Sequence, residues 1–153
     1  MSGRRGPAPS PLSEEQRRRY SRHLALPELG EEGQARLAAS SVLVVGLGGL
    51  GSPVALYLAA AGVGRLGLLD VDVVETSNLQ RQVLHFTSDV GRAKTESAAA
   101  KLAALNPEVE LVPHHVRFSR ETAADLVDRY DVVVTAVDNF AARFLLNDVC
   151  VLH

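Results

Sequence analysis

The stretch from residue 42 to residue 62 constrains the fold of this chain more than any other. It opens with Val42-Leu43-Val44-Val45, a continuous apolar run typical of parallel strands that are buried on both faces. The glycines that follow at once are Gly46, Gly48, Gly49 and Gly51. Ser52-Pro53 then predicts an N-cap and a first-turn proline for a helix that ends at Gly62. This order of strand, glycine loop and helix predicts an α/β fold with a phosphate-binding turn.

Strand-like and helix-like segments alternate along the rest of the chain. Strands are predicted at residues 42–45, 65–71, 109–112 and 131–136. The helices between and after them are predicted at residues 53–61, 93–105, 119–129 and 140–152. The alternation predicts a Rossmann-like, doubly wound, mostly parallel sheet with right-handed connections and helices on both faces. Ligands of such sheets lie beyond the carboxyl ends of the strands, near the first strand.

The chain divides into three predicted parts. These are a disordered tail over residues 1–12, N-terminal helices over residues 13–40 and a nucleotide-binding Rossmann-like domain over residues 41–153. Ser13 and Gln16 predict a capping box that opens a helix through about Ala25, followed by a shorter helix near residues 33–38. The last predicted helix meets the end of the sequence without a capping glycine or a further strand. We therefore expect the domain to be incomplete at its C-terminus.

The composition argues against nucleic-acid and membrane partners. The chain carries 16 Lys and Arg against 18 Asp and Glu, a net charge of −2, so no bulk field attracts nucleic acid or a membrane surface. Its apolar stretches are interrupted well before the ~20 residues that a membrane span needs. The single cysteine, Cys150, excludes an intramolecular disulfide, and we expect a cytoplasmic chain with Cys150 as a small buried side chain. The five histidines have no metal-ligand spacing and receive no role.

An acidic residue stands where a nucleotide-binding fold needs one. Asp70 ends the second predicted strand, roughly 20 residues beyond Gly51, and can accept a hydrogen bond from a ribose hydroxyl there. The alternative for Asp70 is an ordinary strand-ending acid, and Asp72 is expected to be a solvated loop residue. The glycine pattern and Asp70 together predict a nucleotide site, but they do not specify the nucleotide.

Two cations and one further acid favour a triphosphate. Arg81 and Lys94, at the start of the next helix, supply positive charge that a nucleotide losing pyrophosphate requires beyond the glycine loop. Each alone could be an ordinary surface charge. Asp138 follows the last strand at its carboxyl end, where a carboxylate can bind Mg²⁺ together with phosphates. An Asx turn or a helix cap before Phe140 is the alternative for Asp138.

Six ordered blocks of the sequence are similar to the MoeB/ThiF family, the bacterial adenylyltransferases of molybdopterin and thiamine biosynthesis, which are related to ubiquitin-activating enzymes. The blocks are Val45-Gly46-Leu47-Gly48-Gly49-Leu50-Gly51, Ala61-Gly62-Val63-Gly64, Asp70, Ser77-Asn78-Leu79-Gln80-Arg81-Gln82, Gly91-Arg92-Ala93-Lys94 and Asp138-Asn139. The resemblance extends from about Leu12 to the last residue.

The resemblance implies a reaction. Members of the family bind ATP with Mg²⁺, adenylate the C-terminal glycine carboxylate of a ubiquitin-like sulfur-carrier protein and release pyrophosphate. The catalytic residues that it implies are Arg22, Arg81, Lys94 and Asp138. The nucleotide-binding residues that it implies are Gly46, Gly48, Gly49, Gly51, Asp70, Ser77, Asn78, Leu79, Gln80, Arg81, Lys94, Asp138 and Asn139.

Individual roles follow from the resemblance by position. The resemblance implies that Gly49 lies against the phosphates and that Asp70 holds the ribose. The residues implied to engage the triphosphate are Asn78, Arg81 and Lys94. It also implies that Asp138 coordinates Mg²⁺ and that Asn139 lies beside the nucleotide. These residue types suit the chemistry, because a carboxylate is already a nucleophile and needs alignment and charge stabilisation rather than a general base.

Arg22 matches the arginine with which family members reach into the site of a partner subunit, which implies a homodimer. It stands in the run Arg19-Tyr20-Ser21-Arg22-His23 of the first predicted helix. Without the resemblance, the arginines of this helix would be interpreted as a solvated face in which Glu15 pairs with Arg19. With it, we favour a functional role for Arg22.

The family pattern extends beyond this sequence. Family members continue into further strands, a crossover loop for the carrier's tail, Cys-x-x-Cys ligands for Zn²⁺ and sometimes a sulfurtransferase domain. This sequence contains no Cys-x-x-Cys pair. We therefore expect a truncated product or a fragment. The alternatives to an adenylating enzyme are an NAD-binding oxidoreductase domain and a non-catalytic nucleotide- or partner-binding fragment. The sequence does not choose between the molybdopterin, thiamine and tRNA-thiolation pathways.

Overall fold

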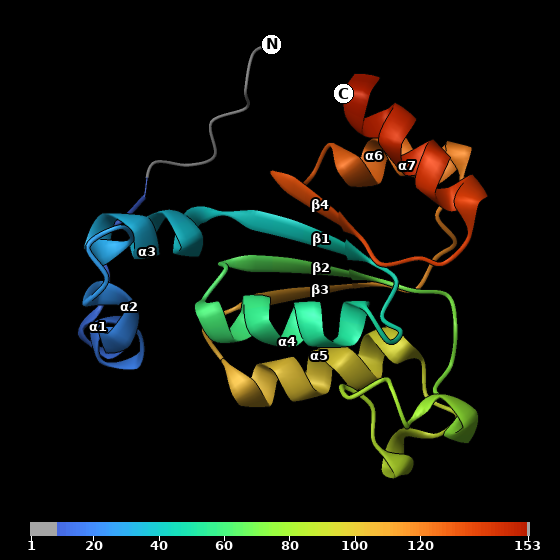
Figure 1. Cartoon of the computed structure of the whole chain (residues 1–153), viewed down its shortest axis with the longest axis horizontal. Coiled ribbons are helices and arrows are strands. Elements are labelled where there is room, and N and C mark those ends of the chain that lie inside the picture. The colour runs from blue at the N-terminus through green and yellow to red at the C-terminus, as the bar shows by residue number, and fades with distance from the viewer. Residues whose placement is uncertain (1–8, 153) are drawn as a thin grey trace.

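The computed structural model describes residues 9–152. The tail predicted over residues 1–12 lies mostly outside the described residues, and His153 lies outside them as well. The part described forms one sheet of four strands with helices on both of its faces (Figure 1).

The sheet is parallel throughout, and its strand order is β3-β2-β1-β4. The strands are β1 (Ser41–Val45), β2 (Arg65–Leu69), β3 (Glu110–His114) and β4 (Val132–Thr135). Val45, at the end of β1, pairs with Leu69 of β2 and with Thr135 of β4, so the three carboxyl ends lie side by side. The predicted α/β class with a doubly wound parallel sheet is therefore confirmed.

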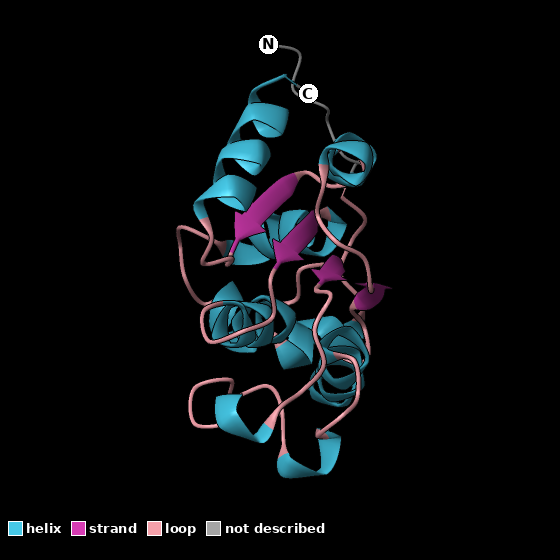
Figure 2. Cartoon of the chain, turned by 90° about the vertical axis from the view of Figure 1, so that its right-hand side faces the viewer, coloured by secondary structure: helices cyan, strands magenta, loops and turns pink. Residues whose placement is uncertain are grey.

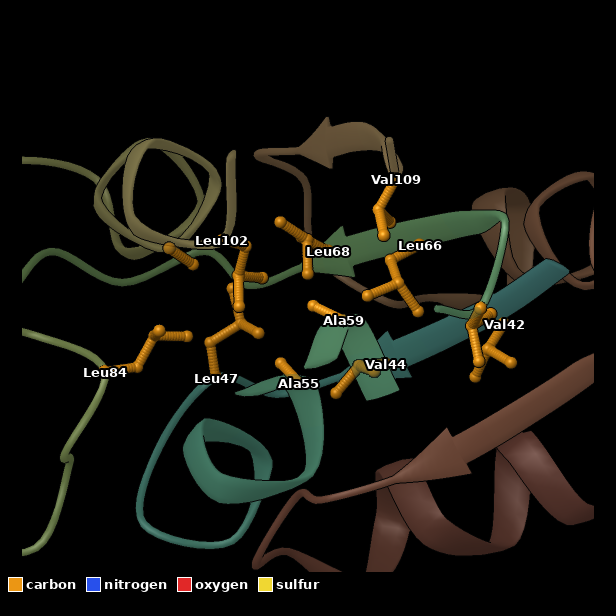
Figure 3. Close-up of a cluster of buried hydrophobic side chains, with 12 residues drawn as sticks. Val42, Val44, Leu47, Ala55, Ala59, Leu66, Leu68, Leu84, Leu102 and Val109 are labelled. Carbon is orange, nitrogen blue, oxygen red and sulfur yellow. The ribbon is translucent and has the colours of Figure 1, made fainter. Parts of the chain in front are cut away.

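Four helices cover the two faces of the sheet. Helices α4 (Gly51–Ala61) and α5 (Lys94–Leu105) cover one face, and α6 (Arg120–Val127) and α7 (Phe140–Leu152) cover the other (Figures 1 and 2). Strand β1 is buried on both faces because its side chains alternate. Val42 and Val44 pack with α4 and α5 in the cluster of Figure 3, whereas Leu43 packs toward α6 and α7.

The N-terminal segment forms three short helices, α1 (Glu14–Arg19), α2 (Ser21–Leu24) and α3 (Gly30–Ala39). The capping box of Ser13 and Gln16 is confirmed. The single helix predicted through Ala25 is wrong, because the chain leaves helical geometry at Tyr20. The Tyr20 ring is buried against Gly62, and its hydroxyl accepts a hydrogen bond from Asn106 Nδ2 at 2.8 Å. This tertiary contact overrides the local preference for one continuous helix.

Two local predictions fail for identifiable reasons. Ser52 does not cap α4, since the helix begins at Gly51 and the Ser52 hydroxyl donates to the Leu47 carbonyl at 3.2 Å. Cys150 is exposed, so its predicted burial is wrong.

The predicted stop of α4 at Gly62 is confirmed by a left-handed φ of 83°. The long loop after β2 holds two single-turn helices, η1 (Thr76–Asn78) and η2 (Thr87–Asp89). Among residues 9–152, no helix is long and apolar enough to cross a membrane.

Candidate functional site

A cavity of about 1530 Å³ opens at the carboxyl ends of β1, β2 and β4. The predicted site residues that line it are Gly46, Gly48, Gly49, Asp70, Asn78, Arg81, Lys94, Asp138 and Asn139. The remaining predicted residues, Gly51, Ser77, Leu79, Gln80 and Arg22, are not among its lining residues. A second wall comes from the segment after β3, from α6 and from α7, and sequence reasoning missed it. Its apolar members include Val116, Phe118, Phe144 and Leu145.

The glycines after β1 serve two different purposes. Gly46 has φ +94°, and a Cβ there would lie 2.9 Å from the Ala136 carbonyl oxygen of the chain leaving β4. A Cβ on Gly51 would lie 1.8 Å from the Gly46 oxygen. These two positions therefore accept only glycine, because backbone atoms fill the space. At Gly48 and Gly49 a Cβ would meet mainly side-chain atoms of Gln82 and Arg81, at 3.4 Å or more, so the loop stays open toward the cavity.

Asp70 anchors the glycine loop to the end of β2. One carboxylate oxygen accepts the Leu47 amide at 2.7 Å, and the other accepts the Asp72 amide at 2.9 Å. A carboxylate has about four lone-pair sites, so Asp70 retains acceptor capacity toward the cavity that it lines. The sequence predicted a ribose contact, but this second duty toward the loop depends on the fold.

His85 holds the same loop through a hydrogen bond, and the sequence analysis gave this histidine no role. Its buried ring contacts the Leu47 carbonyl through Nε2 at 2.9 Å and the Ser97 hydroxyl through Nδ1 at 2.9 Å. A carbonyl can only accept, so Nε2 carries the proton and Nδ1 accepts from Ser97. Burial lowers the pKa of His85, and the charges of Lys94 and Lys101 lower it further, against an opposing hydrogen bond to Leu47. The imidazole is therefore neutral at pH 7.

Lys94 is paired with Asp72 at the mouth of the cavity. Its side chain is only 6% exposed, and Nζ lies 3.0 Å from Asp72 Oδ2, whose side chain is 64% exposed. Asp72 is an exposed loop residue, as expected, and it also forms this ion pair, which the sequence did not indicate. A lysine in the first turn of α5 is disfavoured by the helix dipole, and the Asp72 carboxylate offsets that effect.

Arg81 is oriented by its neighbours in the loop after β2. Its guanidinium donates to Asn78 Oδ1 at 2.9 Å and to Gln80 Oε1 at 3.2 Å. Ser77 and Asn78 in turn donate to the Glu75 carboxylate, at 3.3 and 3.4 Å. Arg81 and Asn78 line the cavity, whereas Gln80 accepts from Arg81 and Ser77 shares the Glu75 carboxylate with Asn78.

Asp138 and Asn139 lie after β4 and have different roles. Asn139 caps α7, because its Oδ1 accepts the Ala142 amide at 2.8 Å. Asp138 is exposed toward the cavity, and its carboxylate makes no hydrogen bond within the described residues. Asn139, and not Asp138, therefore caps the helix. Within the same residues, no three His, Cys, Asp or Glu side chains gather as a ready-made metal cage. One free carboxylate suits Mg²⁺, which usually takes its other ligands from phosphates and water.

Arg22 lies far from the cavity of its own chain. It is exposed on α2. Figure 1 places α2 at the end of the sheet opposite to the loop that joins β1 to α4. The neighbouring Arg17 pairs with Glu31 at 2.6 Å, and Arg19 donates to the Leu105 carbonyl at 3.3 Å.

The chain is similar in sequence to one known protein family and to two named adenylyltransferases/sulfurtransferases. The ThiF family matches residues 20–153. The chain is 61% identical over 146 residues to the adenylyltransferase and sulfurtransferase MOCS3 of Bos taurus, which covers 95% of this chain and 32% of the relative. It is 52% identical over 143 residues to the probable adenylyltransferase/sulfurtransferase MoeZ of Mycobacterium tuberculosis, covering 94% and 36% of the two chains. The chain thus spans about a third of the length of these relatives.

Solved structures share the fold over most of this chain. The E. coli tRNA N6-threonylcarbamoyladenosine dehydratase TcdA, in complex with ATP, matches with a TM-score of 0.87 and 30% identity, over 92% of this chain and 58% of that chain. E. coli MccB with AMPCPP and MccA matches with a TM-score of 0.79 and 33% identity, over 92% and 42%.

Proposed function

Because this chain belongs to the ThiF family, we propose that it takes part in the ATP-dependent adenylation of the C-terminal glycine carboxylate of a ubiquitin-like sulfur-carrier protein. The observation that carries the proposal is the convergence of an open glycine loop, Arg81, Lys94 and the free carboxylate of Asp138 on one cavity. The names of the MOCS3 and MoeZ relatives as adenylyltransferases, and a structural neighbour in complex with ATP, support it.

The reaction joins the carrier to AMP. An oxygen of the carrier's terminal carboxylate attacks the α-phosphorus of ATP. The bond from that phosphorus to the oxygen bridging toward the β-phosphate breaks, and pyrophosphate leaves with the electron pair. The products are a carrier acyl-adenylate and pyrophosphate. No proton has to be removed from the nucleophile, so positioning and charge stabilisation supply the rate enhancement.

The chain's own residues can supply that stabilisation. Gly48, Gly49 and Leu50, which lead into α4, line the cavity, and the backbone before a helix N-terminus favours an anion. Arg81 and Lys94 line the same cavity and add two positive charges. Their partners, Asn78 and Asp72, hold both cations in place before the nucleotide arrives. Asp70 remains the acceptor for the ribose hydroxyls.

We propose Asp138 as the residue that holds Mg²⁺ with the phosphates. The ion would neutralise part of the phosphate charge when bound. We further propose a cytoplasmic homodimer in which Arg22 reaches the site of the second copy. Its exposure and its distance from the cavity of its own chain are compatible with this role.

Carrier-dependent exchange of pyrophosphate into ATP tests the proposal. Purified chain is incubated with ATP, Mg²⁺, labelled pyrophosphate and, in separate reactions, a molybdopterin, a thiamine or a tRNA-thiolation carrier. We expect label in ATP only when a carrier ending in Gly-Gly is present. A competition assay addresses the oxidoreductase alternative, since ATP should displace a fluorescent adenine nucleotide and NAD should not. Stronger displacement by NAD, with no exchange on any carrier, would refute the proposal.

A further inference from the structure

Gln82 is a buried polar residue of the cavity wall to which neither the sequence pattern nor the comparisons assign a role. It directly follows Arg81, and only 4% of its surface is exposed. Its backbone amide donates to the Asn78 carbonyl at 3.1 Å, and its carbonyl accepts the His85 amide at 3.0 Å. The backbone of Gln82 is therefore held by hydrogen bonds on both sides, which restricts the positions that its side chain can reach.

The side-chain amide of Gln82 has an unsatisfied oxygen. Its Oε1 is fully buried and has no hydrogen-bond partner among the described residues. Its Nε2 lies against the glycine loop, 3.6 Å from the point where a Cβ of Gly48 would stand. A buried amide oxygen without a partner costs stability, and an apolar side chain of the same size would avoid that cost.

The surroundings of the amide indicate its ligand. It lines the same cavity as Gly48, Arg81 and Lys94, where an anion would be attracted. A Cβ at position 48 would lie in van der Waals contact with the amide nitrogen, so the glycine there leaves that nitrogen without a side-chain neighbour from the loop. An amide can turn its NH₂ group toward a phosphate oxygen, and this hydrogen bond is stronger than one to a neutral acceptor.

We propose that Gln82 is a further nucleotide-binding residue, whose side-chain amide donates to a phosphate oxygen held at the glycine loop. The inference rests on the proposed function, since it takes the ligand to be ATP. It makes Gln82 a contact to the phosphates and not to the adenosine part of the nucleotide. The binding group is the donor Nε2, which makes no hydrogen bond among the described residues, whereas the unpaired Oε1 lowers the stability of the fold.

A second buried glutamine provides a matched control. Gln34 of α3 is completely buried, but its amide is satisfied: Oε1 lies 2.8 Å from His23 Nδ1, and Nε2 donates to the Ala61 carbonyl at 2.8 Å. It is not among the residues that line the cavity. Replacing each glutamine by methionine keeps the volume and removes the amide, so the two variants differ only in what that amide was bonded to.

The experiment combines calorimetry with thermal unfolding of the full chain. For Gln82→Met we expect about tenfold weaker binding of ATP or more, unchanged binding of adenosine, and an unfolding midpoint that is unchanged or raised. For Gln34→Met we expect a lowered midpoint and unchanged binding of both ligands. Gln82→Glu, which places a negative charge beside the phosphates, should weaken ATP more than Gln82→Met and again spare adenosine.

The outcomes separate this inference from the function on which it rests. If the unaltered chain does not bind ATP, the proposed function and the role of Gln82 fail together. If the unaltered chain and Gln82→Met bind ATP equally, only the role of Gln82 fails. It also fails if Gln82→Met loses ATP and adenosine affinity to the same extent, or if this variant unfolds more easily than Gln34→Met, because the amide is then structural.

Discussion

At the scale of single residues, the glycines after β1 allow folding and binding to be separated by mutation. Gly51→Ala places a Cβ 1.8 Å from the Gly46 oxygen, and we expect it to cost about 2 kcal/mol or more of unfolding free energy. Gly48→Ala meets only the Gln82 side chain, at 3.6 Å, so stability should change by less than about 1 kcal/mol. Its methyl group covers the loop, however, and should weaken ATP binding. Urea unfolding and calorimetry measure both quantities, and equal loss of stability in the two variants would contradict the division.

His85 gives the fold a defined pH dependence. Burial, together with Lys94 and Lys101, lowers the pKa of His85 below its ordinary value of 6.5, so the unfolded chain takes up the proton first. Its contribution to stability is complete above pH 6.5 and is lost as the pH falls toward the folded-state pKa. Burial lowers the pKa of His114 as well, ahead of the effects of Arg129 and Arg65. Both histidines therefore act in the same direction.

We expect the unfolding free energy of the chain to fall between pH 7 and pH 5, and the fall to be smaller in His85→Gln. Denaturant unfolding at several pH values measures it, with His114→Gln as the companion variant that isolates the second histidine. Identical pH profiles for the unaltered chain and His85→Gln would show that folding does not change the pKa of His85.

Asp138 and Asn139 permit a test of metal binding that is free of a stability effect. Asp138→Asn keeps the shape, disturbs no hydrogen bond of the described residues and should leave metal-free ATP binding intact. The enhancement of ATP binding by Mg²⁺ should disappear, because the amide lacks the charge that a hard cation requires. Asn139→Ala, in contrast, removes the cap of α7 and should cost about 1 kcal/mol of stability. Superimposable Mg²⁺ titrations of the unaltered chain and Asp138→Asn would exclude Asp138 as the metal ligand.

At the scale of elements, Tyr20 joins the N-terminal helices to the sheet domain. Its ring packs on Gly62 after α4, and its hydroxyl is bonded by Asn106 after α5. Tyr20→Ala should cost about 3 to 5 kcal/mol and expose the α1 and α2 region to proteases. Tyr20→Phe should cost only about 1 kcal/mol, because Asn106 Nδ2 still donates to the Ala59 carbonyl. Denaturant unfolding and limited proteolysis provide the measurements; protection of residues 13–25 in Tyr20→Ala would contradict this docking.

At the scale of the whole molecule, helix α2, which carries Arg22, and the cavity lie at opposite ends of the sheet. We expect Arg22→Ala and Asp138→Asn each to lower carrier-dependent pyrophosphate exchange by about 100-fold. In a homodimer with Arg22 acting in trans, mixing the two variants restores one intact site per mixed dimer, or about a quarter of all sites. An arginine acting within its own chain gives no recovery, because every site then lacks one residue. Native mass spectrometry verifies that mixed dimers have formed.

The sequence by itself determined the elements and the class of fold. The apolar run at residues 42–45, the glycines after it and the stop at Gly62 depend on local backbone rules, and the structure contains each of them. The parallel direction of the strands followed from the alternation of strands and helices, because each helix returns the chain to the starting edge of the sheet. Lys94 and Asp138 could be selected as charges at a predicted helix start and strand end, and Arg81 as a charge in the loop between the second strand and the next helix.

Only the tertiary structure decided which of these groups meet and what supports them. His85 and Leu47 are 38 residues apart in sequence, so no local pattern indicates their hydrogen bond. The ion pair of Asp72 with Lys94 spans 22 residues, and the break at Tyr20 depends on Gly62 and Asn106. The reason is physical: periodicity encodes the surroundings of a residue within its own helix or strand. Strand order and packing set the partners across the sheet. They therefore also decide whether a buried polar group is hydrogen-bonded or, like Gln82 Oε1, has no partner among the described residues.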